Sequence, residues 1–460
     1  MMGLVKNPSQ PNSIRSMHTP NIYRSPLCQK NKKSFFLLIT SRKTKRVKTS
    51  RSLLLKNQTM SKTRKKPTLL SSSHHRLSDD VVFDILTRLP VKPIIRFRCV
   101  SKSLNSTITD PIFINAHFNL NKAKSLSNNN NNNNGYLLCK TRPVSTSSEA
   151  DLCTVVCNND HTLTEISRFK IPFDPFYIIG FFNGIFCLTA LDEDRDSLCT
   201  KYFGYNCMTC LWNPSIRKFK RLQANNHFDT IGYGFAYHCQ NDDLKVLRFL
   251  RLVHKGPLWW SFQAEVYTLS TDSWRLVEPH NRLIKSVWRI ESNGLFFNGA
   301  LHYIAYTRHN NFLKKIILCF DVNDEKFREI LLPQNYAVEL SSSFDQLAVL
   351  KGSLALINFG QCAGVDNELH EIWVMRDYGV AESWTQKVVP LLNFKSIFGC
   401  MGSDELMISS VRPFSSDRFF LFDLESLNEN NLRIEDLGIE NISLEQYTTD
   451  LMESLVLLND

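Results

Sequence analysis

The chain has 460 residues, of which 43% are hydrophobic, as expected for one or two globular domains with substantial cores. Its formal net charge of +11 is unevenly distributed, because residues 1–78 hold 18 Lys and Arg and no acidic residue. Of the 55 basic residues, 37 remain to face 44 acidic ones, so the rest of the chain has a net charge of −7. These numbers argue against a basic folded surface for nucleic acid, and no apolar run is long enough to span a membrane.

Residues 1–73 form a basic leader that is expected to be disordered, since Ser, Lys, Asn and Arg dominate it. Its Arg- and Ser-rich, acid-free composition is compatible with an organelle transit peptide or a nuclear-import tract. A third interpretation is that translation begins at Met60, just before the first segment that is predicted to be ordered.

A helical module is predicted next, over residues 74–118. Ser78 is a suitable N-cap, and Asp79 and Asp80 place negative charge on the first turn. An apolar stripe follows at helical spacing, a proline ends the helix, and a second helix carries apolar residues on one side and cations on the other. The stripe consists of Val82, Ile85, Leu86 and Leu89, the proline is Pro90, and the cations are Lys92, Arg96, Arg98 and Lys102. A module of this size exposes more apolar surface than it can bury alone, which predicts a protein partner.

The segment "LSDDVVFDILTRLPVKPIIRFRCVSKSLNSTITDPIFINAHF" (77–118) resembles the F-box, and "LPVK" and "RFRCVSK" resemble its large plant subfamily. The resemblance implies docking to the Skp adaptor of an SCF-type ubiquitin ligase and, through it, to a cullin–RING ligase. The residues that it assigns to the adaptor are Leu77, Ile85, Leu86, Leu89, Pro90, Ile94 and Val100. Two positions depart from the family pattern: Ser78 replaces a Pro, and Leu104 replaces a Trp, which predicts a less stable module.

Residues 119–150 are predicted to be a linker, because they contain seven consecutive Asn (128–134). Beyond it, residues 151–460 repeat one pattern of an alternating strand, a polar turn, an aromatic residue and a second strand. The aromatic residues recur every 50 to 57 positions at Phe169, Phe219, Trp274, Phe327 and Trp384, and residues 419–439 supply a degenerate sixth copy. Such a period is typical of the blades of a kelch-like β-propeller.

Glycine-containing strands lie between these hairpins: "FFNGIFCL" (181–188), "IGYGFAY" (231–237), "FFNGALHYI" (296–304) and "VLKGSLALI" (349–357). Their glycines are expected to permit bulges or close backbone approach. The predicted fold is therefore mostly β, with a small N-terminal all-α module followed by a propeller of about six blades; a β-sandwich is the alternative. Several of these phrases also resemble the F-box-associated region of plant proteins.

The thirteen cysteines are expected to be reduced thiols of a cytoplasmic or nuclear protein. Cys207 and Cys210 have the spacing of a zinc-ligand pair, but no second pair follows, and Cys199, His227 or Cys239 would have to complete the site. Ordinary strand cysteines are the favoured interpretation, so neither a metal nor a cofactor is predicted.

No catalytic signature is present, such as Gly-x-Ser-x-Gly or His-Glu-x-x-His, and an enzyme is not predicted. The resemblance implies a substrate receptor in which the F-box binds the ligase and the propeller binds a protein target. A propeller scaffold with a degenerate F-box is the alternative. Exposed aromatic residues and arginines favour interfaces, and the candidate target-binding residues are Trp259, Trp260, Tyr306, Arg308, Arg376 and Tyr378. Blade packing is the alternative role for the two tryptophans.

Overall fold

The structure, a computed structural model, describes the chain from Leu77 to Leu457 with interruptions. The basic leader, including the alternative start at Met60, lies outside the described residues, as does most of the asparagine run. Within the described part, no helix has both the length and the apolar composition needed to cross a membrane. The described residues are 77–128, 136–142, 151–157, 162–171, 176–191, 207–223, 229–253, 260–278, 281–291, 293–309, 312–334, 336, 343–361, 369–390, 394–400, 405–410, 418–423, 429–431, 433–434, 441–448 and 453–457.

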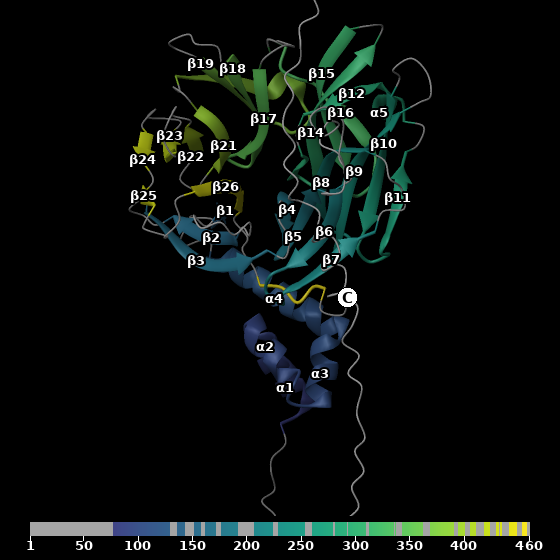
Figure 1. The fold of residues 1–460 in the computed structure, drawn as a ribbon, viewed down its shortest axis with the longest axis vertical. Coiled ribbons are helices and arrows are strands. Elements are labelled where there is room, and N and C mark those ends of the chain that lie inside the picture. The colour runs from purple at the N-terminus through teal and green to yellow at the C-terminus, as the bar shows by residue number, and fades with distance from the viewer. Residues whose placement is uncertain are drawn as a thin grey trace, which may run out of the picture. The chain divides into compact units, whose positions relative to one another are not determined.

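The helical module consists of α1 (Asp79–Thr87), α2 (Val91–Phe97), α3 (Lys102–Thr109) and α4 (Pro111–Asn128) (Figure 1). Ser78 has the extended backbone of an N-cap but makes no capping hydrogen bond, whereas Ser101 Oγ accepts one from the Leu104 N–H at 3.1 Å. Pro111 starts α4, where its missing N–H costs nothing. The helix continues past Phe118, where the module was predicted to end, as far as Asn128.

The four helices enclose a small core. Leu86, Val91, Ile94, Ile108 and Phe113 are buried, and the Phe83 ring packs edge-on against Phe113 with centroids 5.3 Å apart. Leu455, from near the C-terminus of the chain, belongs to the same core and is 1% exposed. The module therefore receives part of its hydrophobic core from the other end of the polypeptide.

The strands form six sheets of the kind that build propeller blades, and all their pairings are antiparallel except that of the short β25 with β3. The first sheet consists of β26 (Asn441–Thr448), β1 (Tyr136–Arg142), β2 (Asp151–Cys157), β3 (Thr162–Lys170) and the parallel β25 (Arg433–Ile434), and the second of β4 (Phe176–Phe182), β5 (Ile185–Leu191), β6 (Cys207–Asn213) and β7 (Lys218–Leu222). The third consists of β8 (Asp229–His238), β9 (Asp243–Val253), β10 (Trp260–Thr268) and β11 (Ser273–Val277), and the fourth of β12 (Val287–Ile290) and β13 (Leu295–Phe297), both beside β14 (Ala300–His309), then β15 (Phe312–Asp321) and β16 (Phe327–Ile330). The fifth consists of β17 (Ser343–Leu350), β18 (Ser353–Gln361), β19 (Leu369–Met375) and β20 (Trp384–Pro390), and the sixth of β21 (Phe394–Cys400), β22 (Glu405–Ser410), β23 (Arg418–Asp423) and β24 (Glu429–Asn431).

The six sheets close into a ring. The first strands of successive sheets contact one another in the order β26, β4, β8, β13, β17, β21 and back to β26. The first sheet also joins the two ends of the propeller region, because β26 pairs with β1 from Tyr136↔Thr448 to Arg142↔Asn441. A closed ring of six sheets is a propeller and not two stacked layers, so it confirms the predicted propeller over the sandwich.

The recurring aromatic residues occupy equivalent positions. Phe169, Phe219, Trp274, Phe327 and Trp384 lie on β3, β7, β11, β16 and β20. Each of these is the fourth strand of its blade when β12 and β13, which both pair with β14, are counted as one position. Their environments differ, since Trp384 is 8% exposed but Phe219 is 55% exposed. The spacing of these residues thus identified the blades, while their burial varies from one blade to the next.

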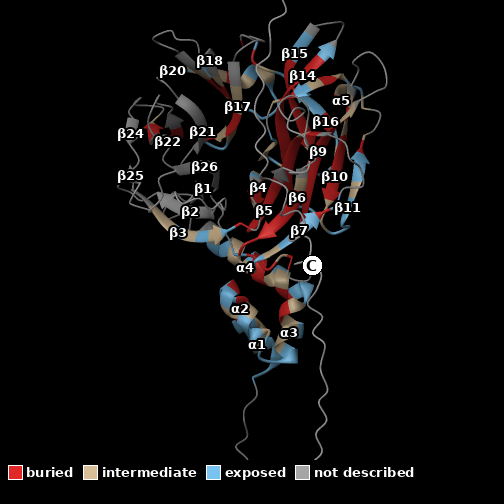
Figure 2. Cartoon of the chain, viewed as in Figure 1, coloured by how far each residue is buried: buried red, intermediate tan, exposed pale blue. Residues whose placement is uncertain are grey.

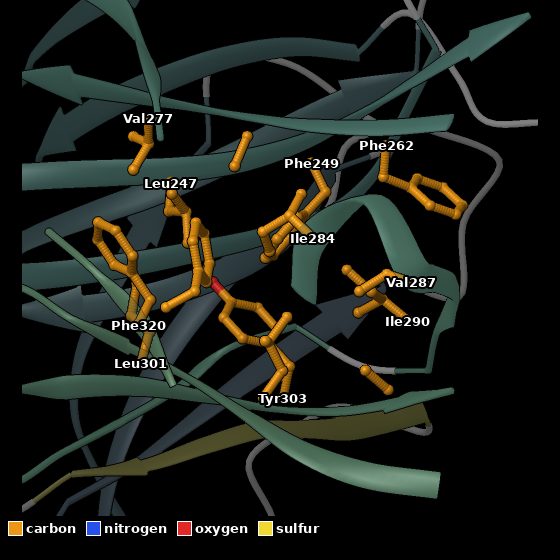
Figure 3. Close-up of a cluster of buried hydrophobic side chains, with 14 of the residues drawn as sticks. Leu247, Phe249, Phe262, Val277, Ile284, Val287, Ile290, Leu301, Tyr303 and Phe320 are labelled. Carbon is orange, nitrogen blue, oxygen red and sulfur yellow. The ribbon is translucent and has the colours of Figure 1, made fainter. Parts of the chain in front are cut away.

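The glycines of the repeat have two separate roles. Three of the four glycine-containing segments are hairpins with positive φ at both turn residues: Asn183-Gly184, Asn298-Gly299 and Lys351-Gly352. Gly234 has the role that was expected, because a Cβ there would lie 2.1 Å from the hydroxyl oxygen of Tyr303. That tyrosine packs edge-on against Phe249, with centroids 5.0 Å apart, in the core between the third and fourth sheets (Figure 3).

Candidate interaction surfaces

Much of α1 and of the end of α2 is exposed (Figure 2), and several of the exposed residues there are apolar. Val81 and Ile85 lie one turn apart on α1 and are 43% and 46% exposed, and Leu77, just before the helix, is 58% exposed. Phe97 and Val100, at and beyond the end of α2, are 38% and 68% exposed. Large apolar residues grouped on one small module indicate a protein-binding face.

The structure divides the seven predicted adaptor-binding residues into two groups. Leu77, Ile85, Pro90 and Val100 are exposed and Leu89 is half-buried, so these side chains are accessible to a partner. Leu86 and Ile94 are buried in the module's own core. The expected single stripe on α1 is also split, because Ile85 points outward while Leu86, one residue and about 100° further around the helix, points inward.

The cations of the module form its polar side, as predicted. Lys92, Arg96 and Lys102 are exposed, and the half-buried Arg98 donates a 3.0 Å hydrogen bond from Nε to Asn105 Oδ1. Leu104, at the position where the family pattern has a tryptophan, packs half-buried against the module core. Leucine is smaller than the tryptophan of the family pattern, and Leu104 packs in the same core as Leu455.

Residues Glu453–Leu457, named the C-terminal bridge, connect the helical module to the propeller. The Glu453 carboxylate accepts a 2.7 Å hydrogen bond from the backbone N–H of Val91 at the start of α2. On the other side, the buried Asn213 donates from Nδ2 to the backbone carbonyls of Ser454 at 2.9 Å and Val456 at 2.8 Å. No periodic pattern in the sequence marks these five residues, and they were not predicted to have this role. A local signal for the contact is the "WNPS" turn (212–215) that contains Asn213.

The bridge identifies which end of the propeller faces the module. Asn213 begins the turn between the third and fourth strands of its blade, and the Lys122 ammonium of α4 lies 5.4 Å from the ring of Tyr237, beside the turn between the first and second strands of the next blade. In antiparallel blades these two kinds of turn share one end, here called the module end. The opposite end is called the far end.

The predicted target-binding residues do not form one site. Trp259 lies outside the described residues, and Trp260 is the first residue of β10, with no described side chain. Arg376 and Tyr378 are exposed on the turn between β19 and β20, at the module end. Arg308 is exposed near the far end of β14, about 20 Å along that strand from His302, which Tyr378 contacts.

Tyr378 takes part in a hydrogen-bonded pair with a buried histidine. Its hydroxyl lies 2.7 Å from His302 Nε2, and His302 Nδ1 lies 3.2 Å from the Leu295 carbonyl oxygen. Because the carbonyl can only accept, Nδ1 carries the proton and Nε2 accepts from Tyr378. Burial lowers the pKa of His302 to about 4, so the neutral ring is the form present at pH 7.

Tyr306 is 5% exposed, so the prediction that it contacts a target is wrong in this conformation. Its ring lies 5.2 Å from the Lys315 ammonium, which forms a fully buried ion pair with Asp345 on the next blade. Burial lowers the pKa of Lys315, but hydrogen bonds with Asp345 and Tyr306 outweigh this and leave the pKa raised. Tyr306 is therefore part of an inter-blade polar core, where its period-2 position on β14 faces the fifth sheet.

The structure favours ordinary packing for Cys210, one member of the possible zinc pair. Its thiol is buried beside Phe186 and Trp212, and burial raises its pKa to about 12, which disfavours the thiolate that zinc requires. The Cys207 side chain lies outside the described set. Among the described residues, no group of three or more His, Cys, Asp or Glu side chains is arranged to hold a metal.

Comparison with known proteins covers most of the chain. A family model described as F-box domain matches residues 75–115, and one described as F-box associated beta propeller domain matches residues 144–455. Two relatives from Arabidopsis thaliana are F-box protein CPR1, 24% identical over 82% of this chain and 88% of its own length, and Protein SUPPRESSOR OF NIM1 1, 25% identical over 75% and 93%. Among solved structures, TolB from Acinetobacter baumannii gives a TM-score of 0.41 at 9% identity, over 72% of this chain and 73% of that chain.

Proposed function

Because the chain belongs to the F-box proteins that carry an F-box associated beta propeller domain, we propose that it is the substrate-recognition subunit of an SCF-type ubiquitin ligase. In this role the F-box docks the Skp adaptor, and through it a cullin–RING ligase, while the propeller binds a protein target. The receptor carries out no chemistry itself. It raises the effective concentration of target lysines near the enzyme that transfers ubiquitin. Such a subunit acts in the cytoplasm or the nucleus.

The observation that carries the proposal is the exposed apolar face of the F-box. Leu77, Val81, Ile85 and Val100 are each more than two-fifths exposed in a module whose own core is already filled by other residues. Apolar area of this kind is costly in water and is recovered when a partner covers it, at about 25 cal/mol per Å². Leu77, Ile85, Leu89, Pro90 and Val100 are therefore proposed to contact the adaptor, while Leu86 and Ile94 shape the helices that present them.

The test is co-expression of the full chain with a Skp adaptor, followed by co-purification. Ile85→Asp places a charge on the proposed docking face and abolishes retention of the adaptor. Leu276→Asp is the matched control, because Leu276 is 45% exposed on β11 of the propeller, against 46% for Ile85. Leu86→Asp is unsuitable, since a charge on a buried side chain unfolds the module whatever its partner.

Two outcomes contradict the proposal. If wild type and both variants fold but none retains the adaptor, the chain is a propeller scaffold with a degenerate F-box, the alternative that the Leu104 departure favours. If Ile85→Asp retains the adaptor as well as Leu276→Asp does, docking uses another face. Thermal unfolding of each purified variant establishes that loss of retention is not loss of fold.

A further inference from the structure

We propose that an acidic segment of the target binds at the far end of the propeller, on a surface named the arginine edge. The arginine edge consists of Arg282, Lys285, Trp288, Arg289 and Arg308, from α5 (Arg282–Ser286), β12 and β14. This inference rests on the proposed function, which requires a target site on the propeller but does not say where it lies or what chemistry it recognises.

These five residues lie on elements that are joined to one another. Helix α5 packs against β14 and continues directly into β12 at Val287. Strand β12 pairs with β14, which places Arg289 opposite Tyr306 and Val287 opposite Thr307. Tyr306 and Thr307 are the two residues that precede Arg308 on β14. The irregular register between Val287 and Arg289 turns Trp288 toward Arg308. Arg282, Lys285, Arg289 and Arg308 are all exposed.

Aromatic rings hold the two arginines of the strands in place. The Arg308 guanidinium lies 5.2 Å from the centroid of the Trp288 ring, and that of Arg289 lies 5.9 Å from the Tyr306 ring. The Tyr306 ring is in turn held by the ammonium of Lys315, which is buried in its ion pair with Asp345. A guanidinium that is already stacked loses little side-chain entropy on binding, and its planar fork matches the two oxygens of a carboxylate.

The exposed positive charges of the arginine edge favour an acidic partner. Arg289 forms a 3.6 Å ion pair with Glu291, whose side chain is 14% exposed, and Glu278, four residues before Arg282, accepts hydrogen bonds from Asn281 and Phe327. Four exposed cations therefore outnumber them, on a body whose residues after position 78 have a net charge of −7. An acidic segment is repelled by most of this body and attracted to the arginine edge, which gives both orientation and specificity.

The location fits a receptor. The module end of the propeller is engaged by the C-terminal bridge and by Lys122 of α4, whereas Arg308 lies near the opposite end of β14. A target bound at the arginine edge therefore stands clear of the F-box and the adaptor bound to it.

The experiment uses the full chain co-purified with the adaptor, and a fluorescein-labelled twelve-residue peptide of alternating Glu and Ser, followed by fluorescence anisotropy at several salt concentrations. Arg289→Gln/Arg308→Gln is expected to weaken binding at least tenfold. The control Arg217→Asn/Lys326→Gln removes the same charge from two exposed residues on turns at the module end and changes the affinity less than twofold. The basic leader is present in every sample, so any binding to it is a constant background.

Further peptides distinguish which chemical group the arginine edge binds. A peptide with Gln in place of Glu is expected not to bind. If both double variants weaken binding equally, the peptide responds only to the net charge of the protein. If neither does, it binds elsewhere, such as to the basic leader. Either outcome overturns the proposal. If only a phosphoserine peptide binds through Arg289 and Arg308, the surface recognises phosphate and the acidic-segment proposal is also overturned. Retention of the adaptor in the same samples shows separately whether the proposed function stands.

Discussion

The backbone N–H of Val91 donates a 2.7 Å hydrogen bond to the carboxylate of Glu453, which lies 362 positions further along the chain. Val91 is the first residue of α2, whose early N–H groups have no partner within the helix, and the helix dipole favours a negative charge at this end. The C-terminal bridge thus caps an F-box helix with one residue and fills the F-box core with another, Leu455. On its other side the bridge is held by the Asn213 side chain of the propeller, so a segment near the C-terminus connects the two regions.

The first prediction concerns this bridge. Leu455→Ala removes a buried side chain from the F-box core and is expected to lower the free energy of unfolding of the module by about 2–4 kcal/mol. Hydrogen exchange at the amides of α1 to α4 measures it locally. Leu276→Ala, at an exposed position, is the control. Unchanged protection of the four helices in Leu455→Ala contradicts the contribution of the bridge to the F-box core.

The second prediction concerns the close approach of Gly234 to Tyr303. The Tyr303 hydroxyl is buried and has no hydrogen-bond partner among the described residues, so Tyr303→Phe is expected to leave stability unchanged or raise it by about 1 kcal/mol. Gly234→Ala alone is expected to destabilise the protein by several kcal/mol, since its Cβ meets that hydroxyl at 2.1 Å and Leu301 at 2.7 Å. Thermal unfolding of both single variants and the double variant measures the coupling, and Tyr303→Phe should relieve part of the Gly234→Ala cost. Strict additivity of the two effects would show that the close approach is absent.

The third prediction is a pH dependence from His302. Its folded-state pKa of about 4 lies below its ordinary value of 6.5, because burial disfavours the charged ring. The unfolded chain therefore binds more protons than the folded one between these values, and this histidine makes stability fall as the pH drops from 6.5 toward 4. His302→Gln is expected to reduce that slope in urea unfolding measured at pH 7, 6, 5 and 4. Burial also lowers the pKa of His117, so part of the slope persists. An unaltered slope in His302→Gln would contradict the assignment.

The fourth prediction concerns the buried pair between the fourth and fifth blades. Asp345→Ala leaves the Lys315 ammonium uncompensated and is expected to cost about 3–5 kcal/mol of stability. Lys315→Met/Asp345→Leu removes both charges and is expected to be far less destabilising than the single variant. Chemical denaturation of the wild type and the two variants checks the order. Equal losses in the single and double variants would mean that packing, and not charge compensation, dominates at this position.

Patterns local in the sequence predicted the fold well. Helical spacing and the proline at position 90 located α1 and α2, and the recurrence of Phe219, Trp274, Phe327 and Trp384 identified the blades. Both signals follow from backbone geometry, since a helix repeats every 3.6 residues, a strand every two, and a blade every four strands. The direction in which single apolar residues point was less predictable, as Ile85 and Leu86 show, because both sides of α1 carry apolar residues and only packing against α4 distinguishes them.

By itself, the sequence determined the family, the order of an F-box before a propeller, and the approximate number of blades, because these depend on contacts between residues close together in the chain. Only the tertiary structure decided that Leu455 completes the F-box core, that Tyr306 is buried, and that Arg308 and Tyr378 lie at opposite ends of the propeller. Each of these depends on closing the ring of sheets and returning the C-terminus to the first helices. Contacts between residues hundreds of positions apart leave no periodic trace in the sequence, so the surfaces that they create become visible only once the ring is closed.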